Sequence, residues 1–148
     1  METAGKRVLI IDDDLDFRAS VTAVLEAQGY AVAGAASARE GLSTIAAEPP
    51  DLIILDIIME HDSAGYEVNQ AIKFRDEFAP SQDIPILMVS SIPLDPATRF
   101  DRAAEVGMIT PDCYMTKPLN MNEFVNQVRI MLESRSKRAS AHGQVSST

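Results

Sequence analysis

Short segments that are apolar at every position constrain the fold of this chain most. Residues 8–11 and 52–55 are the clearest two, and an aspartate directly follows each of them. A strand with one solvated face alternates apolar and polar residues, whereas a strand covered on both faces has no such alternation. The two segments therefore predict central strands of a sheet that has helices on both faces.

Three more segments predict strands, at residues 30–34, 84–89 and 113–116. Between the strands, apolar residues recur at the spacing of an amphipathic helix. They form five groups: Phe17, Val21, Val24 and Leu25; Leu42, Ile45 and Ala46; Val68 and Ile72; Phe100, Ala103 and Ala104; and Phe124, Val128, Met131 and Leu132. Five alternating units with right-handed crossovers predict an α/β fold, a doubly wound parallel sheet of five strands.

Capping residues support the same helix boundaries. Ser37 and Glu40 have the spacing of a capping box, and Asn120 with Glu123 is a looser version of one. Gly29 stands where the first helix should stop. Local signals and apolar periodicity therefore agree on where these helices begin and end.

Polar residues follow four of the predicted strands. Three consecutive aspartates, residues 12–14, follow the first strand, Asp56 the third, Ser90 the fourth and Lys117 the fifth. The carboxyl ends of parallel strands meet at one edge of the sheet, which is where doubly wound proteins bind ligands. This edge is therefore the candidate site.

The acidic residues of this edge predict a metal site. Adjacent carboxylates repel one another, and partial burial adds a desolvation cost that a cation relieves. Asp12, Asp13 and Asp56 form an oxygen-rich set of the kind that Mg²⁺ binds. The alternative is that Asp13 or Asp14 caps the first helix, and capping can coexist with metal binding.

Ser90 and Lys117 have two interpretations each. Ser90 is either a functional hydroxyl or a turn residue. Lys117 is either a cation that reaches over the edge to an anion or a solvated surface lysine. A cis peptide bond before Pro118 would aim Lys117 inward. The residues alone leave both pairs of interpretations open.

Composition limits the class of protein. The 148 residues, 46% of them hydrophobic, suit one soluble domain with its own core. The net charge of −9 disfavours direct binding to nucleic acid, which requires clustered Lys and Arg. A single cysteine, Cys113, excludes an internal disulfide. With no signal-peptide pattern and no apolar stretch that could span a bilayer, the chain is expected to be cytoplasmic, without membrane contact.

The order and spacing of these residues resemble the receiver domain of two-component response regulators, over about residues 5–133. The resemblance rests on an acidic pair after the first strand, an aspartate after the third, Ser or Thr after the fourth and Lys-Pro after the fifth. It implies a flavodoxin-like receiver fold with strand order 2-1-3-4-5. It also implies a role for each candidate residue: Asp56 as phosphoacceptor, Asp12, Asp13, Asp56 and the main-chain carbonyl of Ile58 as ligands of Mg²⁺, Ser90 as switch hydroxyl, Lys117 as phosphate-binding cation and Tyr114 as aromatic switch.

The resemblance also implies partners. Asp56 would receive a phosphoryl group from the phosphohistidine of a histidine kinase or a histidine phosphotransfer protein. Neither His61 nor His142 lies on a helix built to present a phosphohistidine, so this chain is expected to be the acceptor. It would be a signalling switch and not an enzyme, although it takes part in its own phosphorylation and autodephosphorylation. The output would be a surface around Tyr114 that contacts an unknown downstream protein, with a homodimer left open.

The loop after Asp56 departs from the family pattern. The family usually has proline four residues after the phosphoacceptor and glycine eight residues after it. This chain has Glu60 and Ala64 there, with Gly65 one place later. We therefore expect the loop to be one residue longer than usual.

Two apolar residues predict a long-lived phosphorylated form. In the family, the residues two after the phosphoacceptor and two after the switch hydroxyl influence how water reaches the acyl phosphate. Here they are Ile58 and Ile92, whose side chains cannot orient an attacking water. Slow self-hydrolysis is therefore expected.

Residues 134–148 have no apolar periodicity, and a disordered tail is expected there after a receiver domain at residues 5–133. The basic residues Arg135, Lys137 and Arg138 fit a solvated helix end better than a site for an acidic partner. Because no effector domain is evident in the chain, the resemblance implies a stand-alone receiver or a receiver cut from a longer protein.

Two other classes of function compete with a phosphoacceptor. One is a module with the receiver fold that binds partners without phosphorylation, which the altered loop keeps open. The other is a magnesium-dependent phosphatase with Asp12 as nucleophile, because Asp12 and Asp14 also resemble the motif of haloacid-dehalogenase-like phosphatases. The chain has little room for the cap that selects substrates in that class.

Overall fold

The structure, a computed structural model, describes residues 5–56, 68, 70–72, 75, 83–90 and 113–146. Strands and helices alternate over residues 7–56, as predicted. Residues 68 and 70–72 of the third helical segment are helical, and the fourth helical segment lies outside the described residues. In chain order the elements are β1 (Arg7–Ile11), α1 (Leu15–Ala27), β2 (Ala31–Ala35), α2 (Ala38–Ala47), β3 (Leu52–Asp56), β4 (Ile86–Ser90), β5 (Cys113–Thr116) and α6 (Met121–Ser146).

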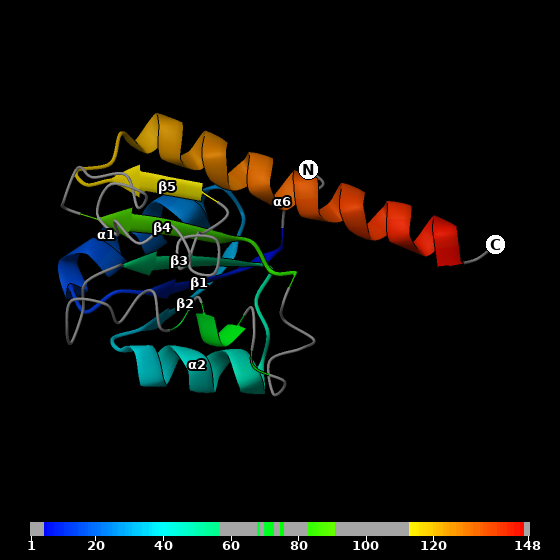
Figure 1. Cartoon of the computed structure of the whole chain (residues 1–148). Coiled ribbons are helices and arrows are strands. Elements are labelled where there is room, and N and C mark those ends of the chain that lie inside the picture. Colours follow the sequence, from blue (N-terminus) through cyan, green and yellow to red (C-terminus); the bar gives the residue numbers. More distant parts are fainter. Residues whose placement is uncertain are drawn as a thin grey trace, which may run out of the picture.

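The five strands form one parallel sheet in the order β2-β1-β3-β4-β5 (Figure 1). Both the strand order and the parallel direction confirm the prediction. Ile11 pairs with Leu55, and Ser90 pairs with Thr116, so the strands end at a common edge. The chain passes from β1 to β2 on one side and then returns to β3 on the other, and this reversal is where doubly wound sheets bind ligands.

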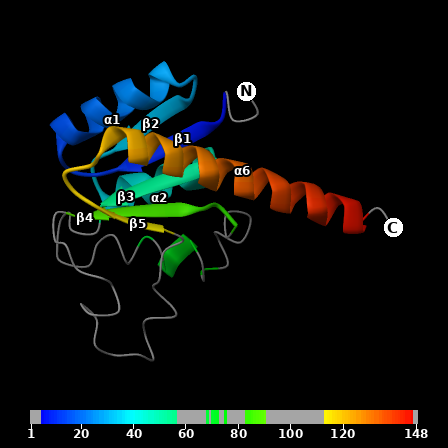
Figure 2. The ribbon, with the colours of Figure 1, turned by 90° about the horizontal axis from the view of Figure 1, so that it is seen from above.

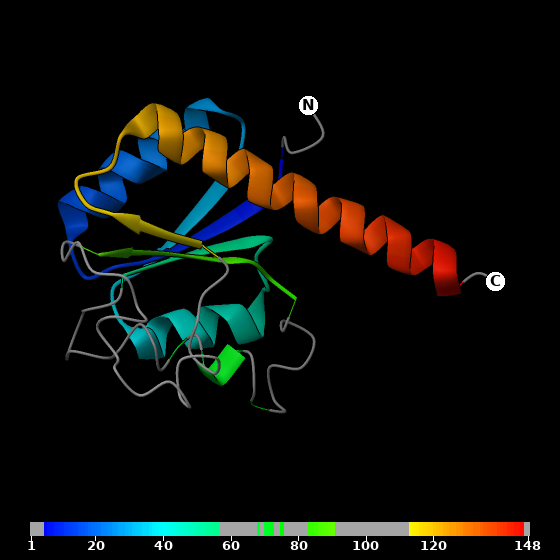
Figure 3. The same ribbon diagram turned by 45° about the horizontal axis from the view of Figure 1, so that its top comes forward.

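Helices cover both faces of the sheet, and β1 serves both layers because successive side chains of a strand point to opposite faces. Leu9 and Ile11 belong to the core layer that contains Ile45 of α2. Val8 and Ile10 belong to the opposite layer, which contains buried residues of α1 and α6. Figures 2 and 3 show α1 and α6 side by side on one face, and Figure 3 shows α2 on the other. The prediction of central strands buried on both faces is therefore confirmed for β1 and β3.

The helix ends follow the predicted capping residues. The Ser37 Oγ accepts a hydrogen bond from the Glu40 amide at 3.1 Å, and Asn120 Oδ1 accepts one from the Glu123 amide at 3.1 Å. Gly29 has a φ of 95° just after α1, a left-handed conformation that glycine adopts without strain. These contacts satisfy main-chain groups that a helix terminus leaves without intrahelical partners.

The helix α6 is longer than the sequence predicts. It continues to Ser146, whereas a disordered segment is expected from residue 134, and Figure 1 shows its far end projecting beyond the sheet. The first half of α6 is anchored by the buried residues Phe124, Val128 and Leu132. No proline follows residue 133, and adding turns to a nucleated helix costs little. The helix therefore runs past residue 133, while the domain limits of 5–133 and the disordered tail stay predictions.

No helix in the described part of the chain combines the length and the hydrophobicity that crossing a membrane requires.

Candidate phosphorylation and metal site

The carboxyl edge of the sheet holds the buried polar side chains. Among the residues that the structure describes, the buried polar or charged ones are Asp12, Asp56 and Ser90, which are 1%, 7% and 1% exposed. They follow or end β1, β3 and β4 at the same edge. Burying a carboxylate is costly unless a partner compensates for the lost water. Two buried carboxylates at one edge of the sheet therefore indicate a functional site.

Three carboxylates meet at this edge. Asp12, Asp13 and Asp56 each offer an oxygen atom, and these atoms all lie within 4.8 Å of one another. Asp13 is exposed while the other two are buried, so the group opens to solvent on one side. An oxygen-only donor set that leaves room for water ligands is the kind that Mg²⁺ binds. The predicted acidic set is thus brought together, and it fits a magnesium ion.

Lys117 brings a positive charge to the same place. Its Nζ lies 2.8 Å from Asp12 Oδ2 and 3.8 Å from Asp56 Oδ2. Its side chain is 18% exposed, and its main-chain N–H donates to the Ser90 carbonyl at 2.6 Å. The peptide bond between Lys117 and Pro118 is cis. Of the two interpretations, the structure favours the inward-reaching cation over the solvated surface lysine.

The three consecutive aspartates have different environments. Asp12 is buried and its Oδ1 accepts from the Asp14 amide at 2.9 Å. Asp14 is the N-cap of α1, and its Oδ1 accepts from the amides of Asp16 and Phe17 at 3.0 and 3.2 Å. Asp13 is left at the solvent side of the acidic group. Capping and metal-site geometry coexist because Asp14 caps α1 while Asp12 and Asp13 contribute oxygens to the acidic group.

Arg18 also contacts this loop, and it is not among the site residues that the sequence predicts. Its Nη1 donates to the main-chain carbonyl of Asp12 at 2.6 Å. A Cβ atom added to Gly34 would lie 3.5 Å from the Arg18 Cδ and Nε atoms, so the Arg18 side chain passes over the end of β2. The signal that could have found it is a basic residue one turn into the helix after the acidic triplet.

Tyr114 lies on β5 and pairs with Met88. Its ring is partly buried against the core layer under α2, and its hydroxyl oxygen is buried. The neighbouring residues Cys113 and Met115 pack against the opposite layer. The ring therefore points inward from the edge strand, and its switch role stays a prediction.

Several predicted features lie outside the described residues. These are the main-chain carbonyl of Ile58, the side chain of Ile92 and the loop from Glu60 to Gly65. The fourth metal ligand, the longer loop and the slow self-hydrolysis therefore stay predictions.

The sequence is similar to a protein family and to several curated proteins. A model of the response regulator receiver domain matches residues 8–129. The chain is 34% identical over 143 residues to the DNA-binding dual master transcriptional regulator RpaA of Synechocystis sp., covering 94% of this chain and 55% of that protein. It is 33% identical over 128 residues to the phosphate regulon transcriptional regulatory protein PhoB of Pseudomonas aeruginosa, covering 86% and 52%. The chain thus spans about half the length of the curated relatives it matches.

Solved structures show the same fold. A CheY-like response regulator receiver domain protein from Methanospirillum hungatei has a TM-score of 0.74 and 27% identity, with 91% of this chain and 99% of that chain covered. The chemotaxis protein CheY4 of Vibrio cholerae has a TM-score of 0.71 and 25% identity, with 86% and 99% covered. Three observations indicate the same family: the strand order, the acidic residues at the carboxyl edge of the sheet, and the family match over residues 8–129. The chain belongs to the response regulator receiver domain family.

Proposed function

We propose that Asp56 is the phosphoacceptor of a two-component signalling system. One observation carries the proposal: buried Asp56 lies in one group with the carboxylates of Asp12 and Asp13, and its Oδ2 is 3.8 Å from the Lys117 ammonium. A lone buried carboxylate would be protonated or avoided, whereas this one has a counter-ion beside it and further acidic groups around it. Such an arrangement suits a carboxylate that receives a phosphoryl group.

The donor would be a phosphohistidine on a histidine kinase or a histidine phosphotransfer protein. A carboxylate oxygen of Asp56 attacks the phosphorus, the bond between phosphorus and the imidazole nitrogen breaks, and the imidazole keeps the electron pair and takes up a proton. The product is an acyl phosphate on Asp56. Water later cleaves it to inorganic phosphate and the free carboxylate. The chain thus acts as a signalling switch and not as an enzyme with a separate substrate.

The residues around Asp56 supply the electrostatics. Asp12, Asp13 and Asp56 would hold Mg²⁺, which neutralises charge on the phosphoryl oxygens when it is bound. Lys117 places its ammonium beside the Asp56 carboxylate and would attract a phosphoryl oxygen. Positioning and charge neutralisation account for most of the catalysis of such transfers. The closeness of Lys117 and the three carboxylates supports the proposal.

The switch would run through Ser90 and Tyr114. A phosphoryl group on Asp56 adds charge and acceptor oxygens, and the Ser90 hydroxyl is the group at the neighbouring strand end that could bond to it. Asp56 pairs with Val89 in the sheet, directly before Ser90. Movement of Ser90 would make space for the inward-pointing ring of Tyr114 and so change the surface beside β5.

The output partner is proposed to be a protein. The two relatives named above are transcriptional regulators, one of them DNA-binding, and this chain covers about half of their length. The net charge of −9 does not suit direct contact with a nucleic-acid backbone. Any DNA binding by the whole protein would therefore belong to a segment other than this one. A cytoplasmic site of action follows from the kinase partner.

The phosphatase alternative is disfavoured by the contacts of the aspartates. Both carboxylate oxygens of Asp12 are engaged, Oδ1 by the Asp14 amide and Oδ2 by Lys117. The Oδ1 of Asp14 is also engaged, because it caps α1 by accepting from two main-chain amides. A partner-binding module that needs no phosphorylation remains as the rival to be tested.

The test is to incubate the chain with magnesium and phosphoramidate and to map any acyl phosphate by mass spectrometry. We expect one label on Asp56, lost in Asp56→Asn and on chelation of magnesium. Asp51→Asn is the matched control, because it removes a carboxylate from the opposite end of the same strand and should keep the label. A label on Asp12 would support the phosphatase, and no label in the native chain would support the binding module.

A further inference from the structure

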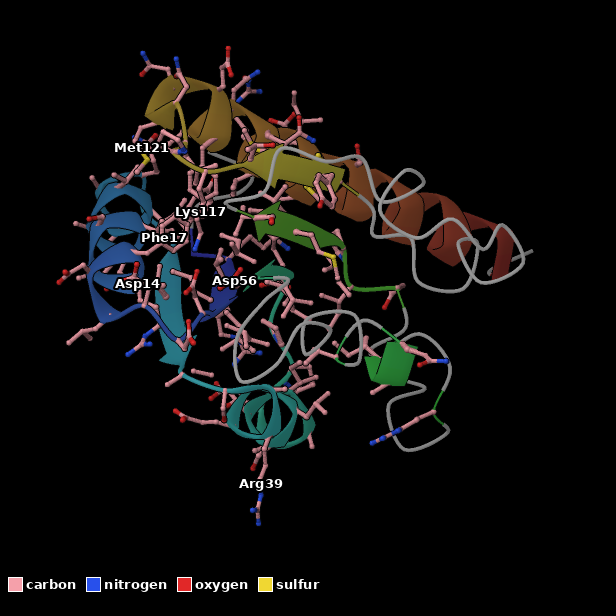
Figure 4. The ribbon with its side chains drawn as sticks, turned by 60° about the vertical axis from the view of Figure 1, so that its left-hand side comes forward. Asp14, Phe17, Arg39, Asp56, Lys117 and Met121 are labelled. Carbon is pink, nitrogen blue, oxygen red and sulfur yellow. The ribbon has the colours of Figure 1, made fainter. Side chains whose placement is uncertain are left out.

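Phe17 contacts the Lys117 ammonium. The Lys117 Nζ lies 4.1 Å from the centroid of the Phe17 ring, which is within the range of a cation–π contact. Figure 4 shows the two side chains next to each other between α1 and the end of β5, with Asp56 close by. The sequence assigns Phe17 only to the apolar stripe of the first helix. The ring therefore has a second contact that core packing does not explain.

Phe17 is fixed in place from two directions. Its ring packs against the buried residues between the sheet and α1 and α6. Its main-chain amide donates to Asp14 Oδ1 at 3.2 Å, and the amide of Asp14 in turn donates to Asp12 Oδ1 at 2.9 Å. Lys117 Nζ contacts Asp12 Oδ2 at 2.8 Å. The contacts therefore form a closed cycle through Phe17, Asp14, Asp12 and Lys117. The position of the Phe17 ring is thus tied to the carboxylate that Lys117 holds.

The two partners of Lys117 differ in what can displace them. Asp12 is a candidate metal ligand, so a bound cation would compete with the ammonium for its carboxylate. The face of a neutral ring binds neither a metal of this kind nor a phosphoryl group, and it attracts the ammonium through its quadrupole. A lysine side chain has a flexible four-carbon stem that can leave the site. The Phe17 ring can therefore keep its contact with Lys117 when Asp12 binds a cation.

We propose that Phe17 is a positioning residue for phosphorylation, which holds the ammonium of Lys117 beside Asp56 through the face of its ring. The proposal rests on Asp56 being the phosphoacceptor. Removing the ring while keeping an apolar side chain should let the ammonium leave the site part of the time. The rate of phosphorylation by a small donor should then fall in proportion to the time that Lys117 spends elsewhere.

The experiment compares Phe17→Leu, which removes the ring, with Phe17→Tyr, which keeps it. Phosphorylation by phosphoramidate with magnesium is measured across donor concentrations, and unfolding in urea checks the fold. We expect Phe17→Leu to be slower by about three- to tenfold, the change that a cation–π contact at a partly desolvated site implies. Phe17→Tyr should stay near the native rate.

A second readout does not depend on activity. Protons above a ring face resonate upfield, so the Lys117 Hε signals should be shifted in the native chain and in Phe17→Tyr, and should return toward ordinary lysine values in Phe17→Leu. Phe124→Leu is the matched control: it removes a ring from the same core layer and should lower stability without moving the Lys117 signals or the rate.

The outcomes separate the two proposals. An unlabelled native chain would overturn the assignment of Asp56 and this inference with it. A labelled native chain whose rate is unchanged in Phe17→Leu overturns the inference alone. Equal loss in Phe17→Leu and Phe17→Tyr, or in Phe124→Leu, also overturns it, because the effect would then come from packing and not from the ring face.

Discussion

Gly41 of α2 lies directly against Ile11 of β1, and replacing it with alanine tests how the two layers fit. Gly41 is buried in α2. A Cβ atom at this position would lie 2.4 Å from Ile11 Cδ1, 2.8 Å from Cγ1 and 3.2 Å from Cγ2. The first two distances are shorter than any ordinary contact between carbon atoms. Either the Ile11 side chain or α2 must therefore move in Gly41→Ala.

The size of the effect follows from two opposing contributions. Alanine is favoured over glycine inside a helix by about 1 kcal/mol. Overfilling a packed core costs roughly 1–3 kcal/mol, and contact with two Ile11 carbon atoms at once places this position in the middle of that range. We expect Gly41→Ala to lower the free energy of unfolding by about 1 kcal/mol, the difference between these terms.

The measurement is equilibrium unfolding in urea followed by circular dichroism. Ser43→Ala is the control, because residue 43 is exposed in the same helix and alanine there meets no buried neighbour. A double-mutant cycle with Ile11→Val, which removes the nearest atom, should recover part of the loss, with a coupling of about 1 kcal/mol. Gly41→Ala that is more stable than the native chain, or a cycle that is additive, would refute the steric reasoning.

Three further predictions concern the helix caps, the acidic loop and the phosphorylated form. Ser37→Ala should lower the free energy of unfolding by about 1 kcal/mol because the Glu40 amide loses its acceptor; urea unfolding checks this, and Ser37→Asp should retain stability. Arg18→Met should lower the free energy of unfolding by about 1 kcal/mol, because the main-chain carbonyl of Asp12 loses a charged donor. An unchanged midpoint of urea unfolding would contradict this prediction. Ile58→Asn together with Ile92→Glu should speed the decay of the phosphorylated form, measured by loss of label over time, and an unchanged decay rate would show that these side chains do not control water.

The sequence sufficed for the central sheet because the signal is local and strong. Residues 8–11 and 52–55 have no polar position, and only a strand covered on both faces accommodates them. The candidate site followed from the same segments, since parallel strands must place the residues after them at one edge. That is why Asp12, Asp56 and Lys117 could be expected to meet before any distance was known.

Other features depended on neighbours that are distant in the sequence. The length of α6 was underestimated because residues 134–146 have no apolar periodicity, whereas the helix is nucleated by its packed first half. Three identical residues in a row do not reveal that Asp14 caps α1 while Asp13 lies at the exposed side of the acidic group. Only the path of the chain after β1 decides which carboxylate points inward.

What the sequence by itself determined is the identity of the chemical groups and the edge on which they lie, because strand polarity and burial follow from local pattern. What only the tertiary structure decided is which groups touch: the Lys117 ammonium against Asp12 and the Phe17 ring, and Gly41 against Ile11. These contacts join residues from different elements, and their distances depend on how closely the helices pack on the sheet. Packing of that kind is set by the sum of all side-chain volumes in a layer, and no single segment of the sequence carries it.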